Sequence, residues 1–179
     1  MSEYYAICLY FDNASSERLM ELMRIAADAC GNRYMLEPKM MPPHITVCYF
    51  TADDITPIEQ VISNEAVSLK CGNVVWPSLG AFVPSVLFAA PTLNEYLANA
   101  CTRFNAQLTS MVTLADYYRL YKWMPHTTLA TKLTDEQLNI AFVNVSAKFR
   151  PFQGMTAALS LVKCEPFTEL RVWQLEEKA

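Results

Sequence analysis

The order of the expected helices and strands repeats once along this sequence of 179 residues, and the repeat constrains the fold more firmly than any local propensity does. In each half, a helix is followed by a strand that opens with Pro-His-x-Thr, then by a capped helix and two further strands. Such a repeat is typical of two pseudo-symmetric lobes, each a sheet packed against helices. We therefore predict an α+β protein with two lobes.

The first half begins with a strand-like segment and continues into a helix whose apolar residues recur at 3/4 spacing. Gly31 follows at the position where a C-cap glycine belongs. Residues 56–59, Thr-Pro-Ile-Glu, match a capping box with proline at the first helical position. The expected elements are strand 4–11, helix 16–30, strand 44–50, helix 56–63, and strands near 67–75 and 85–90.

The second half runs through the same order. Residues 92–95, Thr-Leu-Asn-Glu, match a capping box before a helix with one apolar face, and residues 134–137, Thr-Asp-Glu-Gln, match another. The expected elements are helix 92–108, strand 126–132, helix 134–149, and strands near 154–163 and 169–175. Because no linker separates the halves, we expect a single bilobal domain over 1–179, with the lobe repeat at about 14–90 and 91–176.

The charge of the chain limits the partners that it can bind. The formal net charge is −4 and the pI is about 5.2, so the field of the whole molecule repels a long nucleic-acid duplex. A nucleotide or a short RNA is still an acceptable substrate, because residues 117–134 carry three cations and no acid. A solvated basic loop would give the same local pattern.

The cysteines and histidines argue against a metal site. Six cysteines are scattered along the chain without a C-x-x-C pair, and the only two histidines are far apart in sequence. We expect reduced core cysteines, no metal and no cofactor. No apolar run approaches the roughly 20 residues that span a bilayer, and residues 1–11 lack the features of an export signal. We therefore expect a soluble, cytoplasmic monomer without a membrane partner.

Both histidines lie in the repeated motif, as Pro43-His44-Ile45-Thr46 and Pro125-His126-Thr127-Thr128. On a strand, side chains at i and i+2 point the same way, so each motif places an imidazole beside a hydroxyl. If the two strands face each other, the pairs converge across a cleft. One neutral histidine can then accept a proton from the attacking oxygen while the other, protonated, delivers one to the leaving oxygen. The threonines can donate to phosphoryl oxygens.

A single histidine on an apolar strand is more often a hydrogen-bonded core residue than a catalytic one. The chance that both histidines carry proline before and threonine two residues after is on the order of 10⁻⁵, because each of these residue types makes up about 5–6% of proteins. Coincidence is therefore a poor explanation, and the pair predicts phosphodiester chemistry.

With these two motifs the sequence resembles the 2H phosphoesterase superfamily, in particular its LigT-like or "2′-5′ RNA ligase" branch, over nearly its whole length. The resemblance implies antiparallel sheets that flank a central cleft and metal-independent hydrolysis. The implied substrates are RNA 2′,3′-cyclic phosphates, 2′,5′-linked oligonucleotides or cyclic nucleotides. It makes His44 and His126 the catalytic pair and Thr46 and Thr128 the phosphate-binding residues. The alternative is a non-catalytic module of the same fold that binds nucleotide or RNA.

Further substrate-binding candidates depend on local strand geometry. LigT-like proteins often have an arginine shortly after the second motif, and here Lys132, which strand alternation puts on the His126 face, would replace it as a point charge. Tyr49 matches a position that often stacks on a base. Strict alternation, however, puts Phe50 on the His44 face, so only a bulge would bring Tyr49 there.

Residues 117–123, Tyr-Tyr-Arg-Leu-Tyr-Lys-Trp, interleave aromatic rings with cations, a combination that binds bases and phosphates. Alternation would group Arg119, Tyr121 and Trp123 on one side. A mobile lid or the cover of a core edge would have the same composition. Other catalytic classes are disfavoured, because the chain has no G-x-S-x-G, P-loop or G-x-G-x-x-G motif and only four glycines. The sequence leaves open which histidine is the acid, and whether the reaction is hydrolysis or ligation.

Overall fold

The computed structural model describes residues 3–119 and 121–177, which form two sheets and four α-helices. The strands are β1 (Glu3–Phe11), β2 (His44–Ala52), β3 (Asn73–Trp76), β4 (Ser78–Phe82), β5 (Val86–Ala90), β6 (Thr113–Leu114), β7 (Thr127–Ala130), β8 (Phe152–Lys163) and β9 (Thr168–Gln174). The helices are α1 (Asn13–Cys30), α2 (Thr56–Ala66), α3 (Glu95–Leu108) and α4 (Asp135–Lys148), with 3₁₀ turns η1 (Tyr34–Leu36) and η2 (Asp116–Tyr118).

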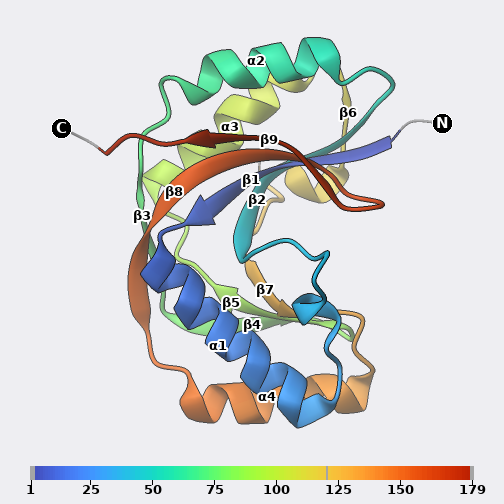
Figure 1. Cartoon of the computed structure of the whole chain (residues 1–179), viewed down its shortest axis with the longest axis vertical. Helices are drawn as coiled ribbons and strands as arrows, with labels where there is room; N and C mark the ends of the chain where they lie inside the picture. Colours follow the sequence, from blue (N-terminus) through green and yellow to red (C-terminus); the bar gives the residue numbers. More distant parts are fainter. Residues whose placement is uncertain (1–2, 120, 178–179) are drawn as a thin grey trace.

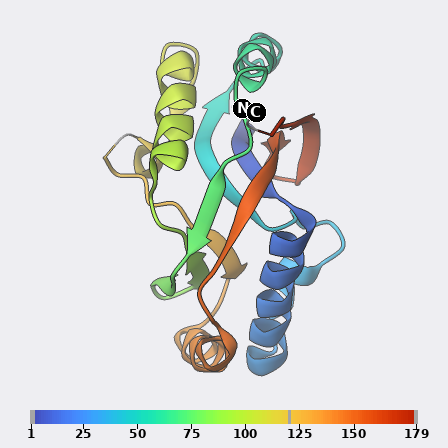
Figure 2. The ribbon, with the colours of Figure 1, turned by 90° about the vertical axis from the view of Figure 1, so that its left-hand side faces the viewer.

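Both sheets are antiparallel. The larger one has the order β3-β8-β1-β2-β6, with β9 paired to β8, and the smaller one has the order β4-β5-β7. Helices α2 and α3 lie outside the larger sheet, and α1 and α4 lie outside the smaller one (Figures 1 and 2). The predicted α+β architecture with helices packed outside antiparallel sheets is therefore confirmed.

Each spatial lobe takes elements from both halves of the sequence. Strands β8 and β9, from the second half, pair with β1 in the larger sheet, whereas β4 and β5, from the first half, pair with β7. Likewise α1 packs against α4, and α3 packs against β2 (Figure 1). The repeat at 14–90 and 91–176 thus stays a prediction about the order of elements, and the spatial lobes do not follow it.

The helix ends can be compared with the predicted capping residues. Thr134 and Gln137 form the expected capping box of α4, and Gly31 ends α1 with a φ of 74°. The other two predicted boxes are wrong. Asn94, not Thr92, caps α3: its side-chain oxygen accepts from the Leu97 amide at 2.9 Å, whereas the Thr92 amide donates to the carbonyl oxygen of Val75 at 2.8 Å. At α2, which Thr56 begins, the Thr56 side chain is not the cap; the Asp54 carboxylate accepts a hydrogen bond from the Thr56 amide at 2.9 Å.

Most expected strands are present, and the structure has two strands that were not predicted. These are the short strands β4 and β6, and β3 is shorter than expected because residues 67–72 form a turn and an isolated bridge instead of a strand. A continuous buried cluster joins the lobes, and its large members include Phe50, Trp76 and Phe104. No helix within residues 3–119 and 121–177 is long and apolar enough to cross a membrane.

Candidate active site

The two histidines are held in the same way at corresponding places. The Nδ1 atom of His44 lies 2.8 Å from the carbonyl oxygen of Pro42, and that of His126 lies 2.9 Å from the carbonyl oxygen of Met124. A carbonyl only accepts, so this partner assigns the proton to Nδ1 in both rings. Each neutral imidazole therefore keeps an unprotonated Nε2, the form that a general base needs.

The two imidazoles lie within electrostatic reach of each other. Burial lowers the pKa of His44 to about 4, with a further lowering from the charge of His126. Burial also lowers the pKa of His126. Strands β2 and β7, which carry the two motifs, come together between the lobes. At neutral pH both rings are uncharged in the free protein, and a bound phosphate would favour protonation of one of them.

A β-bulge on β2 brings Tyr49 to the histidine face. Ile7 of β1 pairs with Cys48, but the next residue, Cys8, pairs with Thr46, so Val47 is the extra residue on β2. Val47 and Cys48 are both buried, and the alternation resumes with Tyr49 half-buried. The bulge that sequence alternation required is thus present, and it puts Tyr49 on the same face as His44 and Thr46.

The two motif threonines have different surroundings. The Thr46 hydroxyl lies 3.5 Å from the Cys8 thiol, and the indole of Trp123 donates to the Thr46 carbonyl oxygen at 3.0 Å. Thr128 is half-buried on β7, on the same face as His126, and it pairs with Phe88 of β5. Its neighbour Thr127 faces the core, where it accepts a hydrogen bond from the indole of Trp76 at 3.2 Å. Each motif therefore presents one imidazole and one hydroxyl on a shared face.

Aromatic rings surround His126. Phe82 meets the imidazole edge-on, with centroids 4.9 Å apart, and Phe88 lies 5.5 Å from it. Gly80 makes room for this arrangement, since a Cβ there would come within 2.4 Å of the Phe88 ring. A cavity of about 620 Å³ opens beside His126, and it is lined by Ala81, Phe82, Val83, Tyr117, Tyr118, Lys122, Met124 and His126. Its largely apolar lining and its volume suit a nucleoside better than a bare phosphate.

The structure does not bring all predicted substrate-binding residues to the histidines. Arg119 and Tyr121 line a different cavity of about 400 Å³ next to α3. The expected strand alternation is wrong here, because the segment forms η2 and a turn in which Tyr121 has a φ of 73°; Leu120 lies outside the described residues. Trp123 instead turns inward against Thr46.

Lys132 is also displaced from its expected position. Strand β7 ends at Ala130, and Lys132 takes a left-handed conformation with a φ of 56°, so alternation from His126 does not reach it. Its ammonium group lies 4.0 Å from the centre of the Tyr34 ring. A cation–π contact therefore occupies this side chain in the free protein.

Several residues beside the histidines were missed by sequence reasoning. Tyr117, Tyr118 and Lys122 belong to the aromatic and basic segment, so the segment was identified but different members of it face His126. Phe82 and Phe88 gave no sequence signal, because their contact with His126 depends on the pairing of β5 with β7 and β4.

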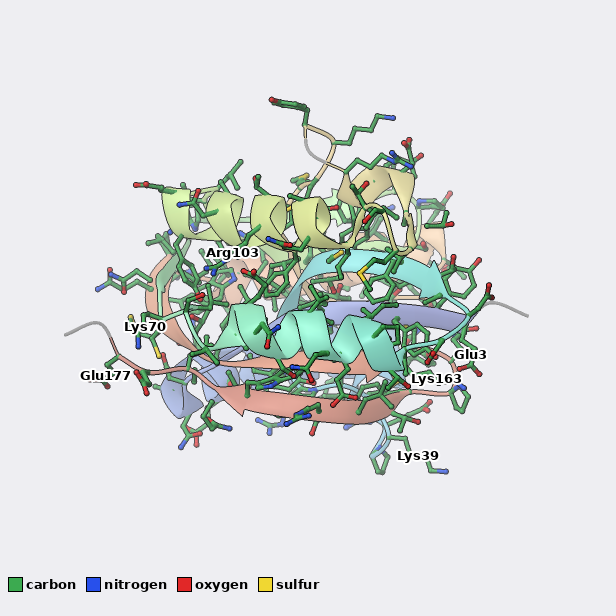
Figure 3. The ribbon with its side chains drawn as sticks, turned by 90° about the horizontal axis from the view of Figure 1, so that it is seen from above. Glu3, Lys39, Lys70, Arg103, Lys163 and Glu177 are labelled. Atoms are coloured by element: carbon green, nitrogen blue, oxygen red, sulfur yellow. The ribbon has the colours of Figure 1, made fainter. Side chains whose placement is uncertain are left out.

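A second, wider cavity of about 850 Å³ lies away from both histidines, between β3 and the start of α3. Figure 3 labels three of its charged residues: Arg103 on α3, and Lys70 and Glu177 at one end of the larger sheet. Lys70 is paired with Glu176, and Arg103 with Glu65, so its cations are already neutralised. Within the described ranges, no three His, Cys, Asp or Glu side chains are grouped to hold a metal ion.

Two comparisons relate the chain to known proteins. The family model described as "2'-5' RNA ligase superfamily" matches residues 15–165. Among solved structures, E. coli LigT complexed with 3'-AMP has a TM-score of 0.66 at 10% identity, covering 98% of this chain and 99% of that one. TT0787 of Thermus thermophilus has a TM-score of 0.62 at 14% identity, covering 100% of both chains.

A third similar structure is that of Usb1 from Kluyveromyces marxianus, with a TM-score of 0.56 at 12% identity and coverage of 97% of this chain and 98% of that one. No curated protein matches the sequence. At these identities the solved structures establish a common fold. The family model adds a match of the amino-acid sequence itself over residues 15–165.

Proposed function

Because the chain belongs to the 2′-5′ RNA ligase superfamily, whose members are phosphoesterases and ligases, we propose that it is a metal-independent phosphodiesterase. Its substrates would be RNA 2′,3′-cyclic phosphates, 2′,5′-linked oligonucleotides or cyclic nucleotides. His44 and His126 would act as general base and general acid, and Thr46 and Thr128 would bind the phosphate. LigT of E. coli was crystallised with 3'-AMP, ATP and NADP+, which supports a nucleotide ligand.

The observation that carries this proposal is the matched bonding of the two imidazoles to carbonyl oxygens two residues earlier in the chain. A histidine fixed through Nδ1 has one defined Nε2 with which to move a proton. In hydrolysis, the neutral ring takes a proton from water as the water oxygen bonds to phosphorus. The protonated ring gives its proton to the ribose oxygen as the P–O bond to that oxygen breaks.

The remaining groups fit this reaction. Charge builds on the non-bridging phosphoryl oxygens, where the hydroxyls of Thr46 and Thr128 can donate hydrogen bonds. The cavity beside His126 would hold the nucleoside, with Phe82 and Tyr117 available to stack on the base. Lys122 in the same lining is paired with Asp116 at 2.6 Å, so the cavity offers little free positive charge for a second phosphate.

The test is turnover of a panel of nucleoside 2′,3′-cyclic phosphates, 2′,5′-dinucleotides and cyclic dinucleotides in buffer with EDTA. We expect His44→Ala and His126→Ala each to lower kcat by about 10²–10⁴. Circular dichroism and thermal unfolding would check that each variant is folded. Full activity in either variant would contradict the proposed roles, as would loss of wild-type activity on chelation. Nucleotide binding without turnover would instead assign the chain as a non-catalytic binding module.

A further inference from the structure

The chain passes from one sheet to the other just before the second motif. Before that point it is attached to β2: Leu114 of β6 pairs with Phe50, and the amide of Ala115 donates to the carbonyl oxygen of Tyr49 at 2.9 Å. Strand β7, which begins at Thr127, instead pairs with β5 in the smaller sheet (Figure 1). The segment between Ala115 and Thr127 therefore sets where the second motif lies relative to β2.

The side chain of Trp123 bonds this segment directly to the first motif. Its indole N–H donates to the carbonyl oxygen of Thr46 at 3.0 Å. The carbonyl oxygen of the next residue, Met124, lies 2.9 Å from Nδ1 of His126. Two consecutive residues thus hold one motif each, and a path through both hydrogen bonds leads from the His126 ring to the strand that carries His44.

The bond from Trp123 reaches β2 next to its bulge. Val47 is the extra residue there, and its carbonyl oxygen accepts a long hydrogen bond, 3.4 Å, from the side-chain amide of Asn105 on α3. Strand β6 pairs with β2 further along, at Phe50 and Thr51. Side chains therefore bond the β2 backbone at the bulge, whereas a strand pairs with it beyond. Because a bulge interrupts regular pairing, such bonds help to fix where the motif lies.

The surroundings of Trp123 distinguish it from a base-stacking residue. Its ring is half-buried and packs against the main hydrophobic cluster, and it does not line the cavity beside His126, which Met124 does line. Core packing accounts for the ring. A buried indole N–H also needs an acceptor, and packing alone does not explain why that acceptor is the carbonyl oxygen of Thr46, within the first motif itself.

The spacing of the two motifs matters for a reaction that uses both. One imidazole must reach the attacking oxygen and the other the leaving oxygen of the same phosphate, each within hydrogen-bond distance. A misplacement of about 1 Å can lower the rate by about 10²-fold. We propose that Trp123 is a positioning residue that sets the spacing of the two histidine motifs through its bond to Thr46. This inference rests on the proposed function, in which both histidines act on one phosphate.

The test compares kcat and KM in Trp123→Phe, which keeps an aromatic ring and removes the N–H. We expect kcat to fall by about 10–100-fold, because fewer molecules hold both imidazoles at the phosphate at once. KM for a nucleoside 2′,3′-cyclic phosphate should change by less than about threefold, since Trp123 does not line the cavity that would hold the nucleoside. An unchanged kcat would overturn the proposal, as would a rise in KM at constant kcat, which would make Trp123 a binding residue.

Trp173→Phe is the matched control, because Trp173 is also half-buried and packs against the same cluster, but lies on β9. It should leave kcat unchanged, and equal losses in both variants would overturn the proposal.

A second variant separates the N–H from the size of the ring. Benzothienylalanine in place of Trp123 has nearly the same shape, with sulfur where the indole has its N–H. It should lose as much kcat as Trp123→Phe. Wild-type kcat with this residue would overturn the proposal, and the result holds even if Trp123→Phe does not fold.

Phosphate binding followed by NMR provides a readout that needs no turnover. The chain has two histidines, so His44→Gln identifies the imidazole signals of each. In wild type, inorganic phosphate should shift the signals of both rings with a single Kd. With benzothienylalanine in place of Trp123, we expect about tenfold weaker binding. A wild type that bound phosphate in this way but turned over no substrate would contradict the proposed function alone. Unchanged affinity in the variant, or a wild type in which phosphate failed to shift both rings, would overturn the inference itself.

Discussion

The ring of Phe82 meets the imidazole of His126 edge-on, with centroids 4.9 Å apart and ring planes at 88°. Phe82 is 39% exposed and lines the cavity beside His126. A base stacked on this ring would lie next to the group that we propose moves a proton. The contact thus joins base binding to the chemical step.

Phe82→Ala should raise KM for nucleoside substrates by about 10–100-fold, because stacking of a base on an aromatic ring contributes about 1–3 kcal/mol. The effect on kcat should be smaller, since both histidines keep their backbone partners. Steady-state kinetics with a nucleoside 2′,3′-cyclic phosphate would measure it. Phe142→Ala is the matched control, because Phe142 is also 39% exposed and lies on α4 away from the cavity. An equal change in KM in both variants would rule out a specific contact.

Gly80→Ala should displace Phe88, one of the two aromatic rings beside His126. A Cβ at this position would lie 2.4 Å from the Phe88 ring, which must then move from its place 5.5 Å from His126. We expect a loss of about 1–3 kcal/mol in the free energy of unfolding, typical of overpacking, together with lower kcat/KM. Urea unfolding and steady-state kinetics would measure the two effects.

Gly31→Ala separates stability from site geometry. A Cβ there meets no atom within 4 Å, but the φ of 74° is unfavourable for alanine, so stability should fall by about 1 kcal/mol. Gly31 lies at the end of α1 and does not line the cavity beside His126. We therefore expect the variant to keep its activity at a temperature where it is folded. Unchanged activity in Gly80→Ala would show that the position of Phe88 does not matter.

The pH dependence of kcat/KM should have its maximum on the acid side of neutrality. This parameter reports the free protein, in which one histidine must be protonated and the other neutral. Burial lowers both pKa values, that of His44 to about 4, so above the ordinary histidine pKa of about 6.5 both rings lose their protons and kcat/KM falls. Bound phosphate favours the imidazolium, so the kcat profile should be shifted to higher pH. A kcat/KM maximum well above pH 7 would contradict these environments.

The sequence predicted the parts of the site that depend on neighbours along the chain. Proline, histidine and threonine at fixed spacing predicted that His44 and Thr46 share one face, and His126 and Thr128 another, because strand alternation is local. The capping box at Thr134 was likewise confirmed, since its two hydrogen bonds join residues three apart. The equally local box at Thr56 was wrong, because Asp54, two residues earlier, accepts a hydrogen bond from the Thr56 amide.

The other errors arose where distant segments set the local geometry. Strict alternation put Phe50 on the His44 face, but the register between β1 and β2 makes Val47 a bulge residue; near the start of α3, the Thr92 amide is bonded to the carbonyl oxygen of Val75 in β3. Arg119 and Tyr121 face a different cavity because the segment forms a 3₁₀ turn pinned to β2. The exchange of elements between the lobes could not be predicted, since the repeat specifies element order and not which sheet each strand joins.

The lowered pKa of His44 also predicts a pH dependence of stability. Between the unfolded pKa of about 6.5 and the folded value of about 4, the unfolded chain binds more protons at this site than the folded protein does. Folding stability should therefore decrease as pH falls through this window, and above it His44 should contribute no slope. His44→Gln removes the titrating group, so wild type should lose on the order of 1–2 kcal/mol more than the variant between pH 7 and pH 5.

Urea unfolding at pH 7 and pH 5 for wild type and His44→Gln would measure this difference. The comparison is between changes in the free energy of unfolding from pH 7 to pH 5. The pH-independent loss of stability from breaking the bond to the Pro42 carbonyl oxygen therefore cancels. His126→Gln should also lose less stability than wild type between pH 7 and pH 5, because burial lowers the pKa of His126 as well. If wild type and both variants lost the same stability on acidification, neither imidazole could be held neutral by burial, and the assignment of both rings as uncharged in the free protein would be wrong.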